Sequence, residues 1–219
     1  MTMKPGHDEL RSDFIAALVD DLQPLTPIRP PQAWLWIGLA VIATITALAV
    51  VKGLWAGPTT GDASAYWFIV HGLLLVLGLA AAANVVTMAS PRVGNSYSGA
   101  KWASLMVGVL PLAAVASLTG AANIPAALID SLGVICAVAA TLSSLLTGAV
   151  LILWLRRGAP VSLQAAGWQT GVAAGGLGTA VYALGCPVDD IVHLGIYHVI
   201  PVAIMALLGA AIVPRLVRW

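Results

Sequence analysis

Residues 131–155 read SLGVICAVAATLSSLLTGAVLILWL, an apolar run without one charged side chain. A transmembrane α-helix needs about 20 consecutive apolar residues to cross about 30 Å of hydrocarbon, and this run is long enough. The whole chain has the same character, with 60% hydrophobic and 9% charged residues and a mean hydropathy of +0.95. Soluble globular domains do not have such a composition. The sequence therefore predicts an all-α integral membrane protein.

Five further runs have the length and apolar character of a transmembrane helix. The six predicted spans cover about residues 34–51, 66–88, 102–118, 131–155, 165–184 and 191–213. The connections between them are short, so residues 32–219 are predicted to form one six-helix transmembrane domain behind a segment of residues 1–31.

The basic residues predict the orientation of the spans, because cytoplasmic loops carry an excess of lysine and arginine. Nine of them fall on the side that holds both termini: Lys4, Arg11, Arg29, Arg92, Lys101, Arg156, Arg157, Arg215 and Arg218. The opposite side has only Lys52, together with Asp62, Asp130, Asp189 and Asp190. Both termini are therefore predicted to be cytoplasmic.

Residues 1–31 alone have the composition of a soluble segment. An amphipathic helix is predicted from Asp8 to Leu22, with acidic residues largely around the rest of its surface. Its apolar stripe consists of Leu10, Phe14, Ile15, Leu18, Val19 and Leu22. A proline-rich spacer with Pro24, Pro27, Pro30 and Pro31 follows. The acidic character is a poor match to an anionic membrane surface, which favours a protein partner.

The reactive side chains lie on the side opposite the termini. Cys136 is about one turn inside the fourth span, Cys186 precedes the sixth, and His71, His193 and His198 lie near the same ends. One interpretation is a signal sensor, in which Cys136 and Cys186 form a disulfide or bind a soft metal ion with His193 and His198. The other is that Cys136 is a small core residue and the histidines are hydrogen-bonded helix residues.

Several other functions find little support in the sequence. No Ser-His-Asp, HExxH or phosphate-loop pattern is present, so no catalytic residues and no enzyme activity are predicted. No charged residue occupies the middle of a span, which argues against an ion-coupled transporter, although a small six-span transporter or channel remains the alternative. Gly167, Gly171 and Gly175 form a small-residue ridge, interpreted as internal packing, with homodimerisation as the other option.

Two stretches resemble the NrsF-type family of six-span bacterial anti-sigma factors. Residues 14–31, FIAALVDDLQPLTPIRPP, are similar to the family's leucine-rich helix and spaced prolines. The second stretch contains CPVDDIVH at 186–193, YHVIP at 197–201 and RLVRW at 215–219. These are similar to the family's Cys-Pro and acidic loop, its aromatic-His-x-x-Pro helix and its Arg-Trp end. With the span count and topology, the resemblance covers essentially the whole chain.

The resemblance implies a regulator of transcription in a stress response, held in the bacterial inner membrane. Its N-terminal helix would bind an extracytoplasmic-function (ECF) sigma factor in the cytoplasm, without direct contact with nucleic acid. Cys136 and Cys186 match the family's periplasmic cysteine pair, so they are the expected sensors of an oxidant or metal. No cofactor is expected except a transient soft metal ion there. The expected partner-binding residues are Leu10, Phe14, Leu18, Asp20, Asp21 and Leu22.

Overall fold

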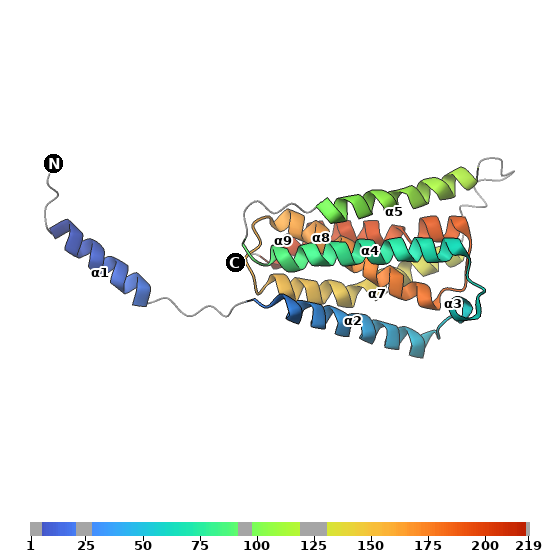
Figure 1. Ribbon diagram of the computed structural model, residues 1–219, viewed down its shortest axis with the longest axis horizontal. Helices are drawn as coiled ribbons and strands as arrows, with labels where there is room; N and C mark the ends of the chain where they lie inside the picture. The colour runs from blue at the N-terminus through green and yellow to red at the C-terminus, as the bar shows by residue number, and fades with distance from the viewer. Residues whose placement is uncertain (1–5, 21–27, 92–97, 119–130, 218–219) are drawn as a thin grey trace.

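The computed structural model describes residues 6–20, 28–91, 98–118 and 131–217, and these ranges contain helices and no strand. Figure 1 shows long helices packed side by side, with the first helix outside the bundle. The elements are α1 Gly6–Asp20, α2 Pro30–Val51, α3 Gly57–Thr60, α4 Ala65–Met88, α5 Ser98–Ser117, α7 Ser131–Leu155, α8 Leu163–Tyr182, η1 Ala183–Gly185, η2 His193–Tyr197 and α9 Ile200–Leu216. The predicted all-α fold class is confirmed for the described ranges.

Five helical segments in the described part of the chain are long and apolar enough to cross a membrane. Their bounds are Pro30–Val51, Ala65–Met88, Ala100–Ser117, Ser131–Leu155 and His193–Leu216. They correspond to five of the six predicted spans and indicate a helical membrane protein. The remaining run, 165–184, forms most of α8, a 20-residue helix whose glycines and two glutamines make it less apolar than the others. The predicted count of six therefore does not follow from helix length and apolarity alone.

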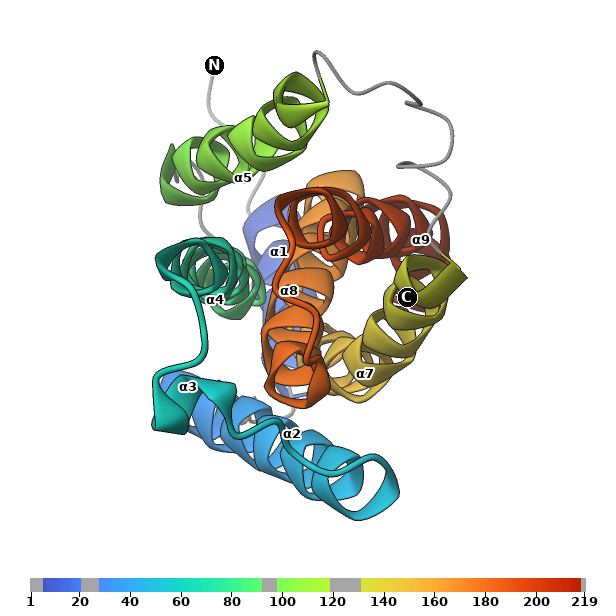
Figure 2. The ribbon, with the colours of Figure 1, turned by 90° about the vertical axis from the view of Figure 1, so that its right-hand side faces the viewer.

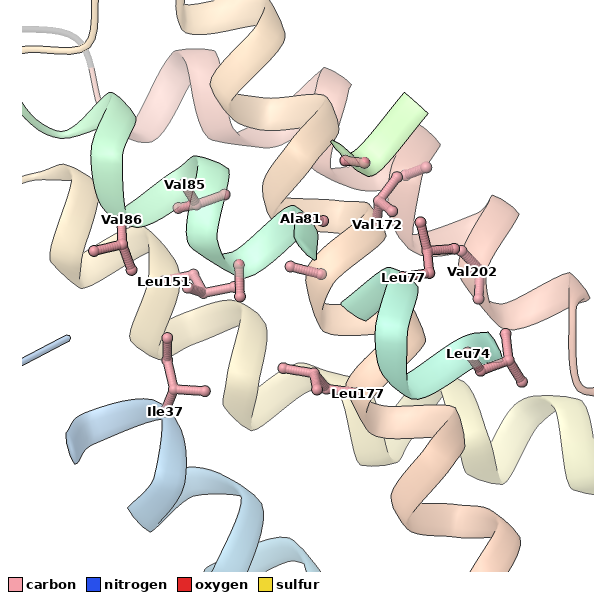
Figure 3. Close-up of a cluster of buried hydrophobic side chains, with 14 of the residues drawn as sticks. Ile37, Leu74, Leu77, Ala81, Val85, Val86, Leu151, Val172, Leu177 and Val202 are labelled. Atoms are coloured by element: carbon pink, nitrogen blue, oxygen red, sulfur yellow. The ribbon is translucent and has the colours of Figure 1, made fainter. Parts of the chain in front are cut away.

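Helix α8 is the centre of the bundle. It packs against α4, α7 and α9, and Figure 2, which looks along the bundle, shows it among them. Figure 3 shows part of this core, where Leu77 of α4, Leu151 of α7 and Leu177 of α8 lie in one cluster of buried side chains. Because other helices cover α8, its surface meets protein over most of its length.

Glycines allow this close packing on several faces of α8. A methyl group at Gly167 would lie 2.6 Å from the Gly209 carbonyl oxygen, and one at Gly171 would overlap the backbone of Met205. On another face, a methyl group at Gly176 would lie 2.9 Å from Gly78 of α4. Helix backbones approach this closely only where side chains are missing. The interpretation of the Gly167, Gly171 and Gly175 ridge as internal packing, here against α9, is confirmed.

Helix α2 lies at the edge of the bundle and is in contact mainly with α7 and α8. Near its N-terminal end, the Trp36 ring packs edge-on against Trp154 at 6.2 Å, and the Arg157 guanidinium lies 4.1 Å above the Trp36 ring. Near its other end, Lys52 Nζ donates a hydrogen bond to Tyr182 Oη of α8 at 2.8 Å. Much of the helix surface between these points is exposed, as Leu39 and Ile42 are.

Helix α2 begins at Pro30, four residues before the start of the predicted span at about residue 34. Pro30 and Pro31 form the first turn of α2 rather than the end of a spacer. Proline is favoured there, because the first backbone N–H groups of a helix have no intrahelical acceptor. Pro24 and Pro27 lie outside the described residues, so the rest of the predicted spacer is not described.

Helix α1 presents apolar side chains to solvent. Phe14 is 65% exposed, Leu18 53% and Val19 59%. The helix is described to Asp20. Asp21 and Leu22, which belong to the predicted partner-binding set, lie outside the described residues, as does the side chain of Leu10. Helix α1 lies outside the bundle in Figure 1. Its described part therefore has an apolar surface that the other described residues leave uncovered.

Candidate functional site

Two cysteines and two histidines gather at the end of the bundle where α2 ends and α4 begins. Cys136 belongs to α7, Cys186 follows η1, His193 begins η2, and His198 follows η2. One sulfur or ring-nitrogen atom from each residue lies within 4.8 Å of those of the other three. All four residues are buried. We call them the Cys–His cluster. The sequence-based expectation that they lie at one end of the bundle is confirmed.

The π-helical turn η2 explains how two histidines five residues apart reach one site. In a regular α-helix, residues five apart point about 140° away from each other. In a π-helix, i→i+5 hydrogen bonding widens the turn and brings such residues much closer to the same face. The wide turn at His193–Tyr197 therefore lets His193 and His198 face the same cluster. Such turns occur frequently at functional sites.

The acidic loop before η2 holds the cluster in place. The Asp190 carboxylate accepts hydrogen bonds from the backbone N–H groups of Val192 at 2.9 Å and His193 at 3.0 Å. The Asp189 carboxylate accepts one from the Ser64 hydroxyl at 2.7 Å, and Ser64 caps the first turn of α4. The loop that carries Cys186 is thereby tied both to η2 and to α4. The two aspartates act here as structural acceptors.

The two thiols are close but separate. Cys136 Sγ lies 3.7 Å from Cys186 Sγ, and both cysteines are free. Cys186 Sγ is also 3.5 Å from His193 Nε2. The hydrogen bond with Cys136, together with burial, raises the pKa of the Cys186 thiol above its ordinary value. Both effects favour the protonated form of the Cys186 thiol.

Tyr182 and Lys52 extend the cluster to α2. The Tyr182 hydroxyl donates a hydrogen bond to Cys136 Sγ at 3.3 Å and accepts one from Lys52 Nζ at 2.8 Å. The Lys52 ammonium also lies 4.6 Å from the centre of the Tyr182 ring. Sequence reasoning missed both roles. Its only signal was that Lys52 is the one basic residue assigned to that side of the membrane.

His71 lies behind His198 and was also missed as a member of the site. His71 Nε2 is 2.9 Å from His198 Nδ1, and His71 Nδ1 is 2.8 Å from the Trp67 carbonyl oxygen. His71 is buried. The sequence placed His71 near the same end of the bundle, but His71 and His198 are 127 positions apart in the chain, so no spacing pattern could show that they are bonded.

The arrangement supports two kinds of chemistry. Two free thiols at this separation can form a disulfide after a small movement, since the sulfurs in a disulfide are about 2.05 Å apart. Two thiolates and two imidazoles are also a common ligand set for soft and borderline metal ions. Both chemistries involve Cys136 and Cys186. The predicted partner-binding residues of α1 are far from the cluster in sequence and belong to a separate surface.

A family model described as "NrsF: Negative regulator of sigma F" matches residues 18–219. The match includes the last turn of the described α1, all of the bundle and the whole Cys–His cluster. No match was found among the curated proteins or among the solved structures.

Proposed function

The chain belongs to the NrsF family of negative regulators of sigma F, and from this premise we propose that it is a membrane anti-sigma factor. The family is one of negative regulators of a sigma factor, and the proposed mechanism of this regulation is as follows. The N-terminal helix sequesters an ECF-type sigma factor in the cytoplasm, and a periplasmic signal at Cys136 and Cys186 releases it. The observation that carries this proposal is the family match over residues 18–219.

The exposed apolar surface of α1 supports its role as the sigma-binding element. Phe14 and Leu18 are each more than half exposed on a helix outside the bundle. Such a helix lays its apolar face in a groove of a partner protein. Acidic residues beside it, such as Asp20, complement the basic surfaces of a protein that binds DNA and steer the encounter. The proposed sigma-binding set also includes Leu10, Asp21 and Leu22, on the basis of the sequence pattern.

The proposed topology has six spans in the bacterial inner membrane. Helix α8 counts as the sixth because it runs beside the others in Figure 1 and is surrounded by them, so it meets helices rather than lipid. A helix in that position does not need a strongly apolar surface. The distribution of basic residues supports cytoplasmic termini. The Cys–His cluster then faces the periplasm.

The signal in this proposal is an oxidant or a metal ion. An oxidant would take two electrons from the two thiols, which lose two protons and form one sulfur–sulfur bond. A metal ion would displace the same protons and be held by the two sulfurs. Either event replaces the hydrogen atom between Cys136 Sγ and Cys186 Sγ and changes what Cys136 Sγ can accept from Tyr182.

The route from the cluster to the output passes through α2. The chain Cys136 Sγ–Tyr182 Oη–Lys52 Nζ reaches the end of α2, whose other end leads to α1. A groove of about 420 Å³ lies between α7 and the C-terminal half of α2. In the proposal, this groove gives that half of α2 room to move. The groove is lined by Ala43, Thr44, Ala47, Leu48, Val51, Lys52, Ala139, Leu142, Ser143, Leu146 and Tyr182. A change at Cys136 would shift α2 and, with it, the sigma-binding helix.

Deletion of α1 tests the sigma-binding part. A chain lacking residues 2–20 keeps α2 intact and should still insert and purify as the same species as the full chain. In a pull-down from membranes with the cognate sigma factor, we expect the full chain to retain the sigma factor and the deletion variant to lose it. Retention by the deletion variant would overturn the proposal.

Cysteine substitution tests the sensing part. We expect Cys136→Ser and Cys186→Ser each to keep repression of the sigma-dependent genes and to abolish their induction by oxidants and metal ions. Reporter transcription measures both properties in the same strain. Normal induction in both variants would show that the cysteines serve only to pack the bundle.

A further inference from the structure

The distances in the Cys–His cluster match those of a tetrahedral metal site. Metal–sulfur bonds of about 2.3 Å and metal–nitrogen bonds of about 2.0–2.1 Å place two sulfur ligands about 3.8 Å apart, and sulfur and nitrogen about 3.6 Å apart. Here Cys136 Sγ and Cys186 Sγ are 3.7 Å apart, and Cys186 Sγ and His193 Nε2 are 3.5 Å apart. The atoms thus stand at ligand spacing, well beyond the spacing of a disulfide.

One ring nitrogen of the cluster, Nε2 of His198, has no hydrogen-bond partner. His198 is fully buried, and its Nε2 atom makes no hydrogen bond. Its other ring nitrogen, Nδ1, is engaged by His71. Buried polar atoms in folded proteins are nearly always partnered, and an exception requires an explanation. Since a ring nitrogen of His198 lies within 4.8 Å of the other three donor atoms, Nε2 is the atom left to complete the set.

His71 decides which form of His198 is present. The Trp67 carbonyl oxygen can only accept, so His71 Nδ1 must carry the hydrogen of that 2.8 Å bond. In a neutral imidazole, His71 Nε2 is then an acceptor, and His198 Nδ1 must donate to it across 2.9 Å. A neutral His198 therefore has its lone pair on Nε2, the unbonded atom. The carbonyl of Trp67 thus determines, through two rings, that His198 presents a ligand lone pair.

We propose that the Cys–His cluster is a preformed four-ligand site for a soft metal ion, and that His71 is the residue that positions His198 in it. The ligands are Cys136 Sγ, Cys186 Sγ, His193 Nε2 and His198 Nε2. Metal-binding histidines commonly donate their second N–H to an acceptor that fixes the tautomer and the orientation of the ring. His71 is that acceptor here, and the Trp67 carbonyl holds His71 in turn.

The chemistry of binding is a simple exchange of protons for an ion. The two thiols release one proton each, each sulfur donates an electron pair to the ion, and the two neutral imidazoles donate theirs without losing a proton. A pair of thiolates with a pair of imidazoles selects Zn²⁺, Cd²⁺ or Cu⁺ over hard ions such as Mg²⁺ and Ca²⁺. The role of such an ion as the releasing signal rests on the proposed function, whereas the site itself does not.

The test is a binding titration of the full chain, reduced and reconstituted in nanodiscs, with Cd²⁺ as the probe. Thiolate-to-cadmium charge-transfer absorption reports bonds to sulfur, and competition with a chromophoric chelator gives the affinity. We expect one Cd²⁺ per chain, with the absorption band lost in the Cys136→Ser and Cys186→Ser variants. Absence of stoichiometric binding, or unchanged affinity without both cysteines, would overturn the proposal.

Two substitutions at His71 separate positioning from packing. His71→Leu removes the acceptor for His198 Nδ1–H and should weaken Cd²⁺ binding about 10- to 100-fold, the usual effect of losing a residue that orients a metal ligand. His71→Gln can donate to Trp67 and accept from His198, so it should restore the affinity to within a few-fold of the wild type. His7→Leu, at the remaining histidine outside the cluster, is the matched control and should change nothing. Equal affinities in His71→Leu and wild type would refute the role of His71.

The outcomes also separate this proposal from the proposed function. If the chain holds the sigma factor but binds no Cd²⁺, the metal site is wrong and the anti-sigma function stands. If the chain binds one Cd²⁺ but retains no sigma factor in the pull-down, the site stands and the anti-sigma mechanism is wrong. Recovery of a disulfide between Cys136 and Cys186 from Cd²⁺-free, oxidant-treated protein with full sigma release would identify oxidation, instead of a metal ion, as the signal.

Discussion

Helices α8 and α2 run side by side through the same bundle but are held in opposite ways. Helix α8 is the less apolar of the two, yet it is buried among α4, α7 and α9 through contacts between backbones. Helix α2 is strongly apolar, yet much of its surface is exposed, and it is tied near its ends by Trp36 and Lys52. In this pair, the strongly apolar helix is the more exposed one, and the glycine-rich helix is the one that faces protein.

This difference assigns the two helices different mechanical roles. Glycine-to-backbone contacts pack α8 tightly against α4 and α9, which opposes a shift of α8 relative to the Cys–His cluster at its end. Helix α2 rests on side-chain contacts beside a groove, so the proposed mechanism assigns the movement to α2. A signal needs an element with two discrete arrangements, and α2 is the element of this bundle best suited to provide them.

The largest expected effect comes from one substitution made in both helices. Gly171→Ala puts a methyl group into the backbone of Met205 and should destabilise the bundle by about 1–3 kcal/mol or more. Gly38→Ala on α2 has no atom within 4 Å of the new methyl group and should be neutral or stabilising by up to about 1 kcal/mol. Thermal unfolding in detergent measures both variants. Equal effects would show that α8 is not the rigid centre.

The next effect concerns the helix that α2 carries. Phe14→Asp places a charge in the apolar surface of α1 and should weaken sigma binding at least about 30-fold, the scale of losing an interface hot spot. Ala16→Asp introduces the same charge about 160° around the helix and is the matched control. Both positions are exposed, so neither change affects the bundle. Isothermal titration with the sigma factor gives the two affinities, and a stronger loss in the control would place the binding surface on the other side of α1.

A smaller effect is expected where the fixed and movable helices meet. Tyr182→Phe removes the hydroxyl between Cys136 and Lys52 and should reduce sigma release at saturating Cd²⁺ several-fold. The Cd²⁺ affinity should stay within about fivefold, because the hydrogen bond from Tyr182 to Cys136 contributes only about 1 kcal/mol. Tyr66→Phe, at the same end of the bundle on α4, is the matched control. Normal release in Tyr182→Phe would remove this route from the mechanism.

The smallest effect is expected at the other end of α2. Arg157→Gln removes the guanidinium above the Trp36 ring and should destabilise the contact between α2 and α7 by about 0.5–1 kcal/mol. The neighbouring Arg156→Gln removes the same charge without this contact and serves as control. Hydrogen exchange in the first turns of α2 should increase in the first variant only. Equal exchange in both variants would mean that Trp154 alone holds this end of α2.

Much of the fold follows from the sequence because hydrocarbon imposes a simple requirement. A chain that crosses it must satisfy its backbone internally over about 20 residues, and apolar runs such as 131–155 record that requirement directly. The run at 165–184 was recognised as a helix but fails on apolarity, because its neighbours are helices. Local patterns report on what surrounds a helix on average and not on which helices these are. The order of packing around α8 was therefore beyond prediction.

The candidate site divides in the same way. The sequence named Cys136, Cys186, His193 and His198, since these residue types are few and fall near the same ends of their spans. It did not show that His71 is hydrogen-bonded to His198 or Tyr182 to Cys136, because hydrogen bonds between helices depend on the rotation and depth of each helix. The π-turn at His193–Tyr197 was equally hidden, since a helical pattern does not reveal one wide turn.

By itself, the sequence determined the class of protein, the positions of five apolar helices long enough to span a membrane, the separate N-terminal helix and the list of reactive side chains. Each follows from composition and local spacing, which act over one helix length. The tertiary structure alone decided that α8 is the centre, that α2 lies at the edge, and that four donor atoms share one small site with His71 behind them. Those facts depend on contacts between residues far apart in the chain, and only close packing selects them.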